Sequence, residues 1–596
     1  MKQPGVPDGR SLPGGGRIPG LPVQYIHGGN TMSKIIGGQL AAEALIDRDV
    51  EYIFSLSGGH ITPIYQYLEN SRITIFDTRH EQAAVFMAEA WARMTRKPAV
   101  AMVTAGPGFT NALSGIASAR LSNAPVILIS GCVGMESVEK LDLQDMSQLP
   151  VIAPMVKKAL VCQVPERIPE FIDMAFRAAM SGRPGPVYLE LPCDILNAEV
   201  NMTKVKKVKT SLSSAPVDRE STAKAVDLLQ AAKSPVIIAG SGVWYADAGK
   251  ELTEFVEKTG IPVFTLGAGR GVVPDTHPLC FESSLAIRPG AAMLSLMSAD
   301  CVLFLGGRLS LFYIFGEIFQ PSAKFIQVDI LPDEIGRNRS VDLGIVSDLK
   351  AFLAELNSVV DGRGIGAALR DQNAGWVETV RKADADGKAQ ARSMWDADTL
   401  PIHPMRLARE VNDFMNREDD IVVADGGDTS TWMGMTRTVR RGGTYLDYGL
   451  YGCLAVGIPF GNAAKLKNPD KRVLVIMGDG SAGFNFMEFH TAIRKKLPIV
   501  VVIGNDQSWG MIMHSQQLRM GHHIPNGTEL GWVDYHKMVE NLGGFGICVE
   551  RPEDIRPALE AAFASGKTAC VNVKVDPSVI SPGSVALANL GGYKTS

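Results

Sequence analysis

Two acidic segments near the carboxyl end of the chain have the residue types and the spacing of a magnesium–phosphate site. Asp479 lies in a Gly-Asp-Gly turn after the apolar run 473–477, and Asp506 follows the apolar run 499–503. The segment between them is long enough for one helical crossover, which brings both carboxylates to the carboxyl edge of one parallel sheet. Oxygen ligands at that edge suit Mg²⁺, and glycines let backbone N–H groups approach a phosphate. A plain type I′ turn is the alternative.

A second candidate residue, Glu81, lies far upstream of these aspartates. It stands between the apolar run 73–76 and an Ala-rich stretch, 81–94, for which we expect a helix. A carboxylate held in a largely apolar cleft has a raised pKa, which suits proton exchange near neutral pH. The alternative is a first-turn glutamate that is favoured by the helix dipole alone.

The elements that position these residues follow from the alternation of apolar runs and amphipathic stretches. From Ile35 onward, expected strands alternate with expected helices, which predicts α/β domains with parallel sheets. The first 31 residues are instead rich in Gly and Pro, and we expect them to be a disordered extension or an over-long start, with Met32 as the alternative initiator. The expected organisation is a first domain at 32–200, a central domain at 215–357, a helical linker at 358–400, a third domain at 401–577 and a tail or lid at 578–596.

Composition describes an ordinary globular protein and excludes several classes of partner. Of 596 residues, 46% are hydrophobic and 20% are charged, and the net charge of −4 gives no basic surface for nucleic acid or membrane. No apolar run reaches the ~18 residues that a membrane span needs. The eight cysteines are scattered without a Cys-x-x-Cys pair, so we expect reduced thiols in a cytoplasmic protein.

Several motifs together resemble one enzyme family. The segments RHEQAA around Glu81, VTAGPGFTNA, LDLQDMSQ, MGDGSAGFN and IGNDQSWG resemble stretches of thiamine diphosphate (ThDP) enzymes of the acetolactate synthase-like superfamily. The resemblance covers residues 33–576 and is strongest to 2-hydroxyacyl-CoA lyases and benzaldehyde lyase. It implies an α/β fold with three doubly wound parallel-sheet domains: pyrimidine-binding, central Rossmann-like and diphosphate-binding.

The same resemblance assigns expected roles to residues of this chain. Glu81 would hydrogen-bond the aminopyrimidine N1′ of ThDP and so promote deprotonation of the thiazolium C2. The residues implied in holding the cofactor are Asp479, Asp506 and the Ser508 carbonyl as Mg²⁺ ligands, Gly480, Ser481, Gly427, Asp428 and Thr429 at the diphosphate, and Leu454 beneath the bent cofactor. Asp506 departs from the family, in which an asparagine is usual.

Two further residues would face the reacting atoms of the substrate. His60 matches the histidine of a GGH or GAH turn in the lyases, and a histidine with a near-neutral pKa can take a hydroxyl proton. Gln144 matches a glutamine that would hydrogen-bond a substrate oxygen. For His60, a turn residue tolerated at positive φ is the alternative.

The reaction that we expect is cleavage of a 2-hydroxyacyl-CoA into an aldehyde or ketone and formyl-CoA. An acetolactate synthase-like carboligase acting on 2-oxo acids is the main rival, and such an enzyme often carries FAD, which this sequence neither supports nor excludes. A benzaldehyde lyase-like acyloin lyase ranks third, because the segment 445–451 lacks the further histidine of that enzyme. A catalytically silent subunit of the same fold is the alternative from a different class.

Contacts to coenzyme A and to other subunits are less defined by the sequence. Arg270, Arg288 and Arg308 could meet phosphates, although surface arginines are the simpler interpretation. The turn 239–243 (AGSGV) is a weak sign of a nucleotide site and favours a structural turn. The tail, with Lys594, could close over the site or fray. The resemblance further implies a homodimer or homotetramer with ThDP at the subunit interface.

Overall fold

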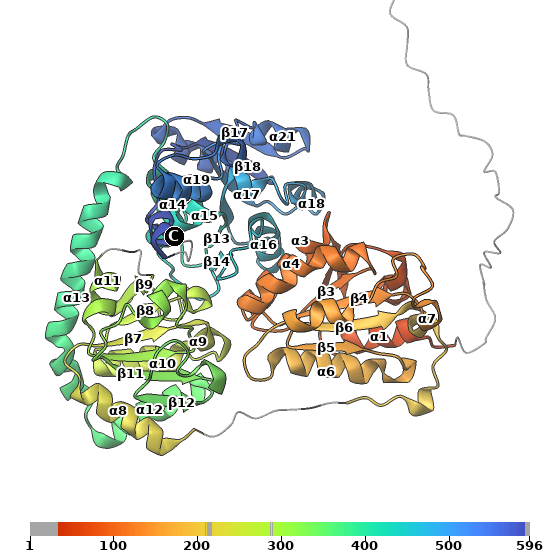
Figure 1. Ribbon diagram of the computed structural model, residues 1–596, viewed down its shortest axis with the longest axis horizontal. Helices are drawn as coiled ribbons and strands as arrows, with labels where there is room; N and C mark the ends of the chain where they lie inside the picture. Colours follow the sequence, from red (N-terminus) through yellow and green to blue (C-terminus); the bar gives the residue numbers. More distant parts are fainter. Residues whose placement is uncertain (1–33, 209, 211–216, 286–287, 289, 591–596) are drawn as a thin grey trace, which may run out of the picture.

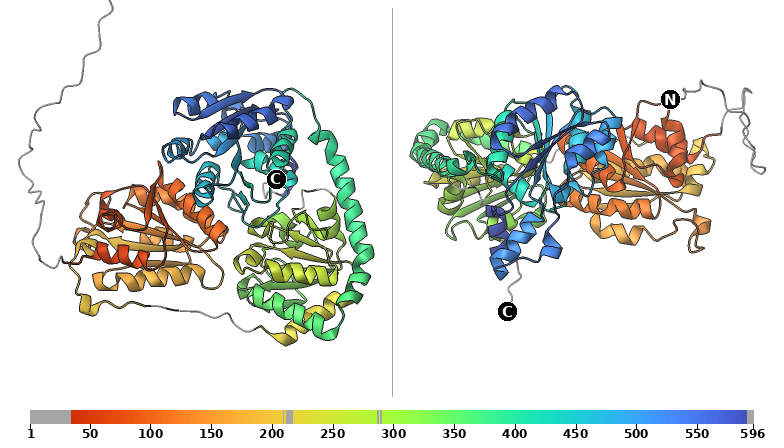
Figure 2. Two further views of the ribbon diagram at one scale, coloured as in Figure 1. Left: turned by 180° about the vertical axis from the view of Figure 1, so that it is seen from behind. Right: turned by 90° about the horizontal axis from the view of Figure 1, so that it is seen from above.

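The computed structural model describes residues 34–208, 210, 217–285, 288 and 290–590. Within these residues the chain forms three parallel sheets of six strands each, and their domains lie at the corners of a triangle (Figure 1, Figure 2). The predicted fold class, three α/β domains with parallel sheets, is confirmed. The expected extension 1–31 and Lys594 lie outside the described residues. In the part of the chain described, no helix is long and apolar enough to cross a membrane.

The first domain places one six-stranded sheet between two layers of helices. In Figure 1, α3 and α4 cover the face toward the third domain, and α1 and α6 cover the other. All residues of β3 and β4 are buried, as expected for parallel strands covered on both faces. The strands in spatial order are β2 (Thr74–Asp77), β1 (Tyr52–Ser55), β3 (Ala99–Val103), β4 (Val126–Cys132), β6 (Val187–Pro192) and β5 (Lys158–Val161). The helices are α1 (Gly37–Ile46), α2 (Thr62–Leu68), α3 (Glu81–Thr95), α4 (Pro107–Leu121), α5 (Leu149–Ile152), α6 (Ile168–Met180) and α7 (Cys193–Asn197).

The central domain has a different strand order and is Rossmann-like. Its strands in spatial order are β12 (Leu343–Val346), β11 (Lys324–Asp329), β10 (Cys301–Leu305), β7 (Pro235–Ala239), β8 (Val263–Thr265) and β9 (Cys280–Ser283). Its helices are α8 (Arg219–Ala231), α9 (Ser241–Tyr245), α10 (Gly249–Thr259), α11 (Ala291–Ser298) and α12 (Leu349–Arg363). The long helix α13 (Gly366–Trp395) then runs along the edge of the molecule toward the third domain (Figure 1).

The third domain repeats the strand order of the first. Its strands in spatial order are β14 (Tyr445–Asp447), β13 (Ile421–Ala424), β15 (Val473–Gly478), β16 (Val500–Asn505), β18 (Ala569–Lys574) and β17 (Phe545–Val549). Its helices are α14 (Pro404–Phe414), α15 (Gly427–Thr436), α16 (Gly457–Lys467), α17 (Asp479–Ala482), α18 (Glu488–Arg494), α19 (Gly510–Met520), α20 (Pro525–Thr528), α21 (Tyr535–Asn541), α22 (Ile555–Ala564) and α23 (Pro582–Leu590).

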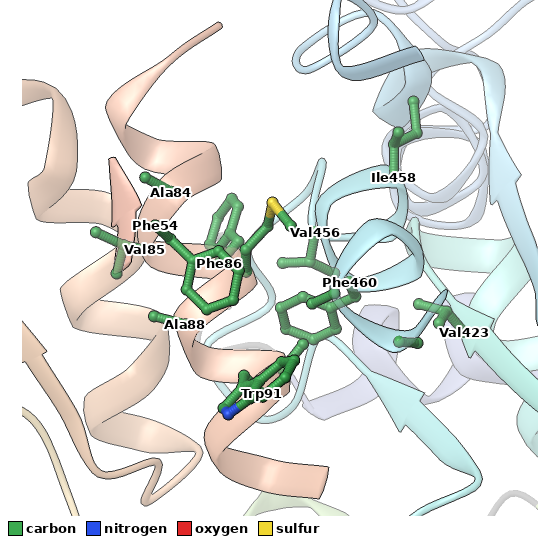
Figure 3. Close-up of a cluster of buried hydrophobic side chains, with 14 of the residues drawn as sticks. Phe54, Ala84, Val85, Phe86, Ala88, Trp91, Val423, Val456, Ile458 and Phe460 are labelled. Atoms are coloured by element: carbon green, nitrogen blue, oxygen red, sulfur yellow. The ribbon is translucent and has the colours of Figure 1, made fainter. Parts of the chain in front are cut away.

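The first and third domains share one hydrophobic core. Helix α3 packs against α16, and the rings of Phe86 and Phe460 meet edge to face with 6.2 Å between their centroids (Figure 3). Both phenylalanines are fully buried, as are Ala84 and Val456 beside them. Such a contact fixes the helix that begins with Glu81 against the domain that carries Asp479.

Candidate active site

Glu81 owes its position to the start of α3. The preceding His80 caps this helix, and its Nδ1 accepts a hydrogen bond from a first-turn backbone N–H at 3.1 Å. Glu81 is 6% exposed, and its Oε2 accepts a hydrogen bond from Nδ2 of Asn111 at 3.0 Å. Gly108 lies beside the other oxygen, because a β-carbon at this glycine would be 3.5 Å from Oε1. Asn111 therefore holds one carboxyl oxygen and leaves the other for a ligand.

A chain of three polar side chains joins His60 to Gln144. Nδ1 of His60 lies 3.1 Å from Oγ1 of Thr104, which donates to Oε1 of Gln144 at 3.4 Å. Since Thr104 gives its proton to Gln144, it accepts the Nδ1 proton of His60, and Nε2 is left with a lone pair. Burial lowers the pKa of His60, against the opposing effect of the Asp142 carboxylate. His60 is therefore neutral near pH 7 and can act as a base.

His60 and Gln144 differ in backbone conformation. The interpretation of His60 as a turn residue at positive φ is wrong, since it lies in the short 3₁₀ helix Gly59–Ile61 at negative φ. Gln144 instead adopts φ +65°, next to Leu143, whose side chain is 76% exposed. A non-glycine residue held in this region reflects strain that the surrounding structure must support.

Two buried aspartates meet at the carboxyl edge of the third sheet. β15 pairs with β16 up to Gly478 and Gly504, so Asp479 and Asp506, which follow the two strands, come together. Burial raises the pKa of Asp479, and the neighbouring Asp506 carboxylate raises it further. Burial also raises the pKa of Asp506. Within the described residues neither carboxylate forms an ion pair with lysine or arginine, so a bound cation would relieve their repulsion.

The remaining donors at this edge fit a hard divalent cation. Ser508 N donates to Oδ1 of Asp506 at 3.0 Å, which turns this loop back toward the aspartates. Oγ of Ser508 is buried without a hydrogen-bond partner. Two carboxylates with a nearby carbonyl and hydroxyl match the oxygen ligands that Mg²⁺ prefers. The alternative of a type I′ turn at Gly478–Gly480 is wrong, because Asp479 begins the short helix α17.

The expected diphosphate residues have separate structural roles. A β-carbon at Gly480 would lie 2.6 Å from the ring of Trp509, so only glycine fits there. Oγ of Ser481 accepts a hydrogen bond from Ala455 N at 2.9 Å, which braces the segment of the half-buried Leu454. Ser481 can therefore serve a phosphate through its backbone N–H while its side chain supports the cofactor's expected wedge.

Asp428 differs from its neighbours in the first turn of α15. Its carboxylate accepts hydrogen bonds from Ser581 and Ser584 and lies 2.7 Å from Nδ1 of His514. Although burial opposes it, the hydrogen bond to Asp428 raises the pKa of His514, which favours an ion pair. The Asp428 side chain thus anchors α23 instead of facing a phosphate. Thr429, in contrast, lies between the strand ends, with Oγ1 3.5 Å from a β-carbon placed on Gly478.

The two groups of candidate residues lie on different domains of the chain and are not joined. Among the described residues, no hydrogen bond connects Glu81, His60 or Gln144 with the aspartates of the third domain. Other contacts join the two domains; for example, Arg79 N donates to Oε1 of Glu488 at 2.8 Å, and Nδ2 of Asn485 donates to Oε1 of Gln82 at 3.4 Å. The structure therefore shows two half-sites, one on each domain.

A cavity of about 690 Å³ lies where the three domains and α23 meet. Glycine-containing strand ends of the central sheet form one wall, including Gly240 in the AGSGV turn. The interpretation of Arg270 and Arg288 as surface residues is wrong: they are 4% and 8% exposed and pair with Asp275 and Glu282. Arg308 bonds to Leu121 O and to Asn123 and lines the cavity.

Sequence reasoning missed two residues of the first half-site. Thr104 and Asn111 orient His60 and Glu81, and both lie in the VTAGPGFTNA motif that carries part of the family resemblance. The motif was the available signal, but its polar residues could be assigned only through contacts with distant segments.

Comparisons with known proteins identify the family of the chain. Three family models match: the thiamine pyrophosphate (ThDP) enzyme N-terminal TPP binding domain at residues 35–151, the central domain at 222–356 and the C-terminal TPP binding domain at 425–573. An acetolactate synthase large subunit of Mycobacterium tuberculosis is 34% identical over 91% of this chain and 96% of its own length. A 2-hydroxyacyl-CoA lyase of Arabidopsis thaliana is 30% identical over 92% and 96%, and 2-hydroxyacyl-CoA lyase 2 of Bos taurus is 30% identical over 95% and 94%. The chain therefore belongs to the thiamine pyrophosphate enzyme family.

Proposed function

We propose that the protein is a ThDP- and Mg²⁺-dependent carbon–carbon lyase that cleaves 2-hydroxyacyl-CoA thioesters. The observation that carries this proposal is the array of His60, Thr104 and Gln144, which leaves a neutral imidazole nitrogen free as a base. A 2-hydroxyacyl substrate has a hydroxyl proton that must leave during cleavage, whereas a 2-oxo acid has none. The relatives named as 2-hydroxyacyl-CoA lyases support the same choice.

The residues at the carboxyl edge of the third domain's sheet fit the cofactor and its metal. Asp479, Asp506 and Ser508 would hold Mg²⁺, and backbone N–H groups of Gly480 and Ser481 would hold the diphosphate. When bound, ThDP supplies a nucleophilic carbon and an electron sink for the cleavage step.

Glu81 handles a proton of the cofactor ring. Because Asn111 occupies Oε2, proton exchange falls to Oε1, the oxygen beside Gly108. The absence of a bulky side chain at Gly108 leaves space at that oxygen. Little reorganisation is then needed during the reaction, since the carboxyl group is already fixed by one hydrogen bond.

His60 acts on the substrate. Its Nε2 takes the proton of the 2-hydroxyl group as the C1–C2 bond breaks, an aldehyde or ketone leaves, and formyl-CoA is completed by protonation at C1. Thr104 fixes the imidazole tautomer throughout. Gln144 accepts the Thr104 hydroxyl proton at Oε1 and presents its amide N–H groups to a substrate oxygen.

The cavity between the domains offers space for part of the acyl-CoA. Arg308 in its wall has no carboxylate bonded to it in the described structure, and burial lowers its pKa to about 10, so it stays charged near neutral pH. We assign it to a phosphate group of the coenzyme. Arg270 and Arg288 are excluded from that role by their buried carboxylate partners.

An acetolactate synthase-like carboligase is the second candidate. It is favoured by the 34% identity to the mycobacterial synthase, and the same cavity could accept FAD. In that case a 2-oxo acid would be decarboxylated and its remainder joined to a second carbonyl compound. A benzaldehyde lyase-like acyloin cleavage ranks third.

We further propose that the active enzyme is a homodimer or a dimer of dimers with ThDP between subunits. Both half-sites expose apolar side chains in the single chain: Leu141 and Leu143 are 95% and 76% exposed, and Phe484 and Ile524 are 60% and 52% exposed. Apolar groups gathered beside incomplete sites favour burial by a second copy. Light scattering during turnover tests this, and a fully active monomer would contradict it.

A substrate screen tests the function. Purified protein is incubated with 2-hydroxyacyl-CoAs, acyloins and pyruvate, with and without ThDP and Mg²⁺. We expect ThDP-dependent formyl-CoA from hydroxyacyl-CoAs. Acetolactate from pyruvate together with a flavin absorbance spectrum, and no formyl-CoA, would select the second candidate instead.

A further inference from the structure

Gln148 is a buried amide behind the first half-site. It is 2% exposed and stands just before α5, four residues after Gln144. Its Oε1 accepts a hydrogen bond from Gly106 N at 3.0 Å, and its Nε2 donates to Gly131 O at 3.0 Å. The side chain thus joins the end of β3 to the end of β4 through two glycines.

Each of these glycines supports one residue that faces the substrate. A β-carbon at Gly106 would lie 2.8 Å from Cβ of Gln144, so the two backbones are in close contact. A β-carbon at Gly131 would lie 2.5 Å from Cβ of His60. Gly106 also has φ +56°, a conformation that favours glycine. A shift of either glycine would therefore move His60 or Gln144.

Two groups on β6, the buried Tyr188 and the partly buried Glu190, orient the amide. Nε2 of Gln148 lies 3.0 Å from Oη of Tyr188 and 3.1 Å from Oε2 of Glu190, and Tyr188 donates to that same carboxylate at 2.7 Å. The carboxylate requires the N–H end of the amide on its side, which turns Oε1 toward Gly106. Only a side chain with both a donor and an acceptor satisfies this arrangement.

We infer that Gln148 is a positioning residue, which sets the distance between His60 and Gln144 through Gly131 and Gly106. The inference rests on the proposed function, because it takes His60 and Gln144 as the groups that meet the substrate. Glu81 is held separately, by Asn111 and by the start of α3. Gln148 should therefore affect substrate turnover but not the binding of ThDP.

The test uses Gln148→Met, which keeps the length of the side chain and removes both hydrogen bonds. We expect kcat/KM to fall about 10- to 100-fold, the usual effect of losing a group that orients a reactive residue. The affinity for ThDP should stay unchanged. The acid limb of the pH profile, which reports His60, should move, and a purely structural role would not move it.

The chain offers a matched control. Gln327 in the central domain is 1% exposed and likewise holds a loop, since it donates to Glu334 O and accepts from Gly336 N. Gln327→Met should lower thermal stability to a similar extent without changing kcat/KM of the folded enzyme. Equal losses of kcat/KM in the two methionine variants would overturn the inference, as would a wild-type kcat/KM in Gln148→Met.

An exchange variant adds a second test. Gln148→Glu places a carboxyl group against Glu190 and should lower kcat/KM at least as much as methionine does. Adding Glu190→Gln restores one donor opposite one acceptor and should recover part of the activity. No recovery would count against the orienting role of Glu190. All values of kcat/KM are measured with the substrate that the wild-type enzyme turns over fastest. If the proposed substrate class is wrong, the substrate screen shows it, and the comparison of these variants stays valid.

Discussion

The first and third domains have the same strand order but different chemistry at the same edge of the sheet. β1, β3 and β4 occupy the places that β13, β15 and β16 occupy in the third sheet. Thr104 directly follows β3, and Asp479 directly follows the equivalent β15. A neutral hydroxyl in a hydrogen-bonded array thus corresponds to a buried carboxylate in an acidic pair. The shared topology brings strand ends together, and the side chains at those ends decide what they bind.

This difference predicts that the two edges serve different steps, substrate turnover and cofactor binding. The carboxyl edge of the first domain's sheet (the first edge) carries His60, Thr104 and Gln144, groups that exchange protons or hydrogen bonds with a substrate. The carboxyl edge of the third domain's sheet (the third edge) carries Asp479 and Asp506, two buried carboxylates that a bound cation would stabilise. Substitutions at the first edge should change turnover at saturating cofactor, and those at the third edge should change cofactor retention.

The largest expected effect is that of Glu81→Gln. The amide keeps the shape and can still meet Asn111, but it cannot exchange a proton, so kcat should fall on the order of 10²- to 10⁴-fold. Steady-state kinetics at saturating ThDP measure this, and calorimetry should show little change in ThDP affinity. Unchanged turnover of every substrate would exclude Glu81 from catalysis.

The opposite pattern is expected for Asp479→Asn. Loss of one carboxylate should weaken binding of Mg²⁺ and ThDP about 100-fold or more, since Mg²⁺ is held by few protein ligands. Activity should recover at high concentrations of both. Titration of activity against ThDP and Mg²⁺ checks this, and a variant with normal affinities but a low kcat would break the division between the two edges.

Sequence reasoning recovers the parts of this comparison that are local in the chain. The alternation of apolar runs and helices predicted three parallel α/β domains, and the Gly-Asp-Gly and RHEQAA motifs placed Asp479 and Glu81 at strand ends. Helix 81–94 was predicted within one residue of the observed α3.

What it could not recover depends on contacts between distant segments. The side-chain contacts of Asp428 are one example, because its partners His514, Ser581 and Ser584 come from elements folded back onto α15. The expected place of Asp428 at the diphosphate stays a prediction. Gln148 showed no signal of its own, because its role depends on backbone groups far from it in the sequence. Spacing along the chain contains no information about either arrangement.

The pH dependence sharpens the description of the first edge. Burial lowers the pKa of His60 from its ordinary value of 6.5, so the basic form predominates at pH 7 and is lost as pH falls through a pKa below 6.5. kcat/KM should be flat near neutrality and fall about tenfold per unit of pH at the acid end. His60→Gln should abolish this limb as well as lower the rate. Asp142→Asn removes the carboxylate that opposes the shift and should move the limb to lower pH; an unmoved limb would assign it to another group.

The smallest expected effect comes from making the third edge more like the first. Asp506→Asn replaces a carboxylate by a neutral amide and leaves Asp479 without its repelling neighbour. Binding of Mg²⁺ alone should weaken about tenfold, whereas the ThDP–Mg²⁺ complex should bind almost as well, because one negative charge beside the diphosphate is also lost. Thermal shift with Mg²⁺ in the absence of ThDP separates the two effects. If Mg²⁺ stabilised both proteins equally, the acidic pair would not be the metal site, and the contrast between the two edges would rest on Asp479 alone.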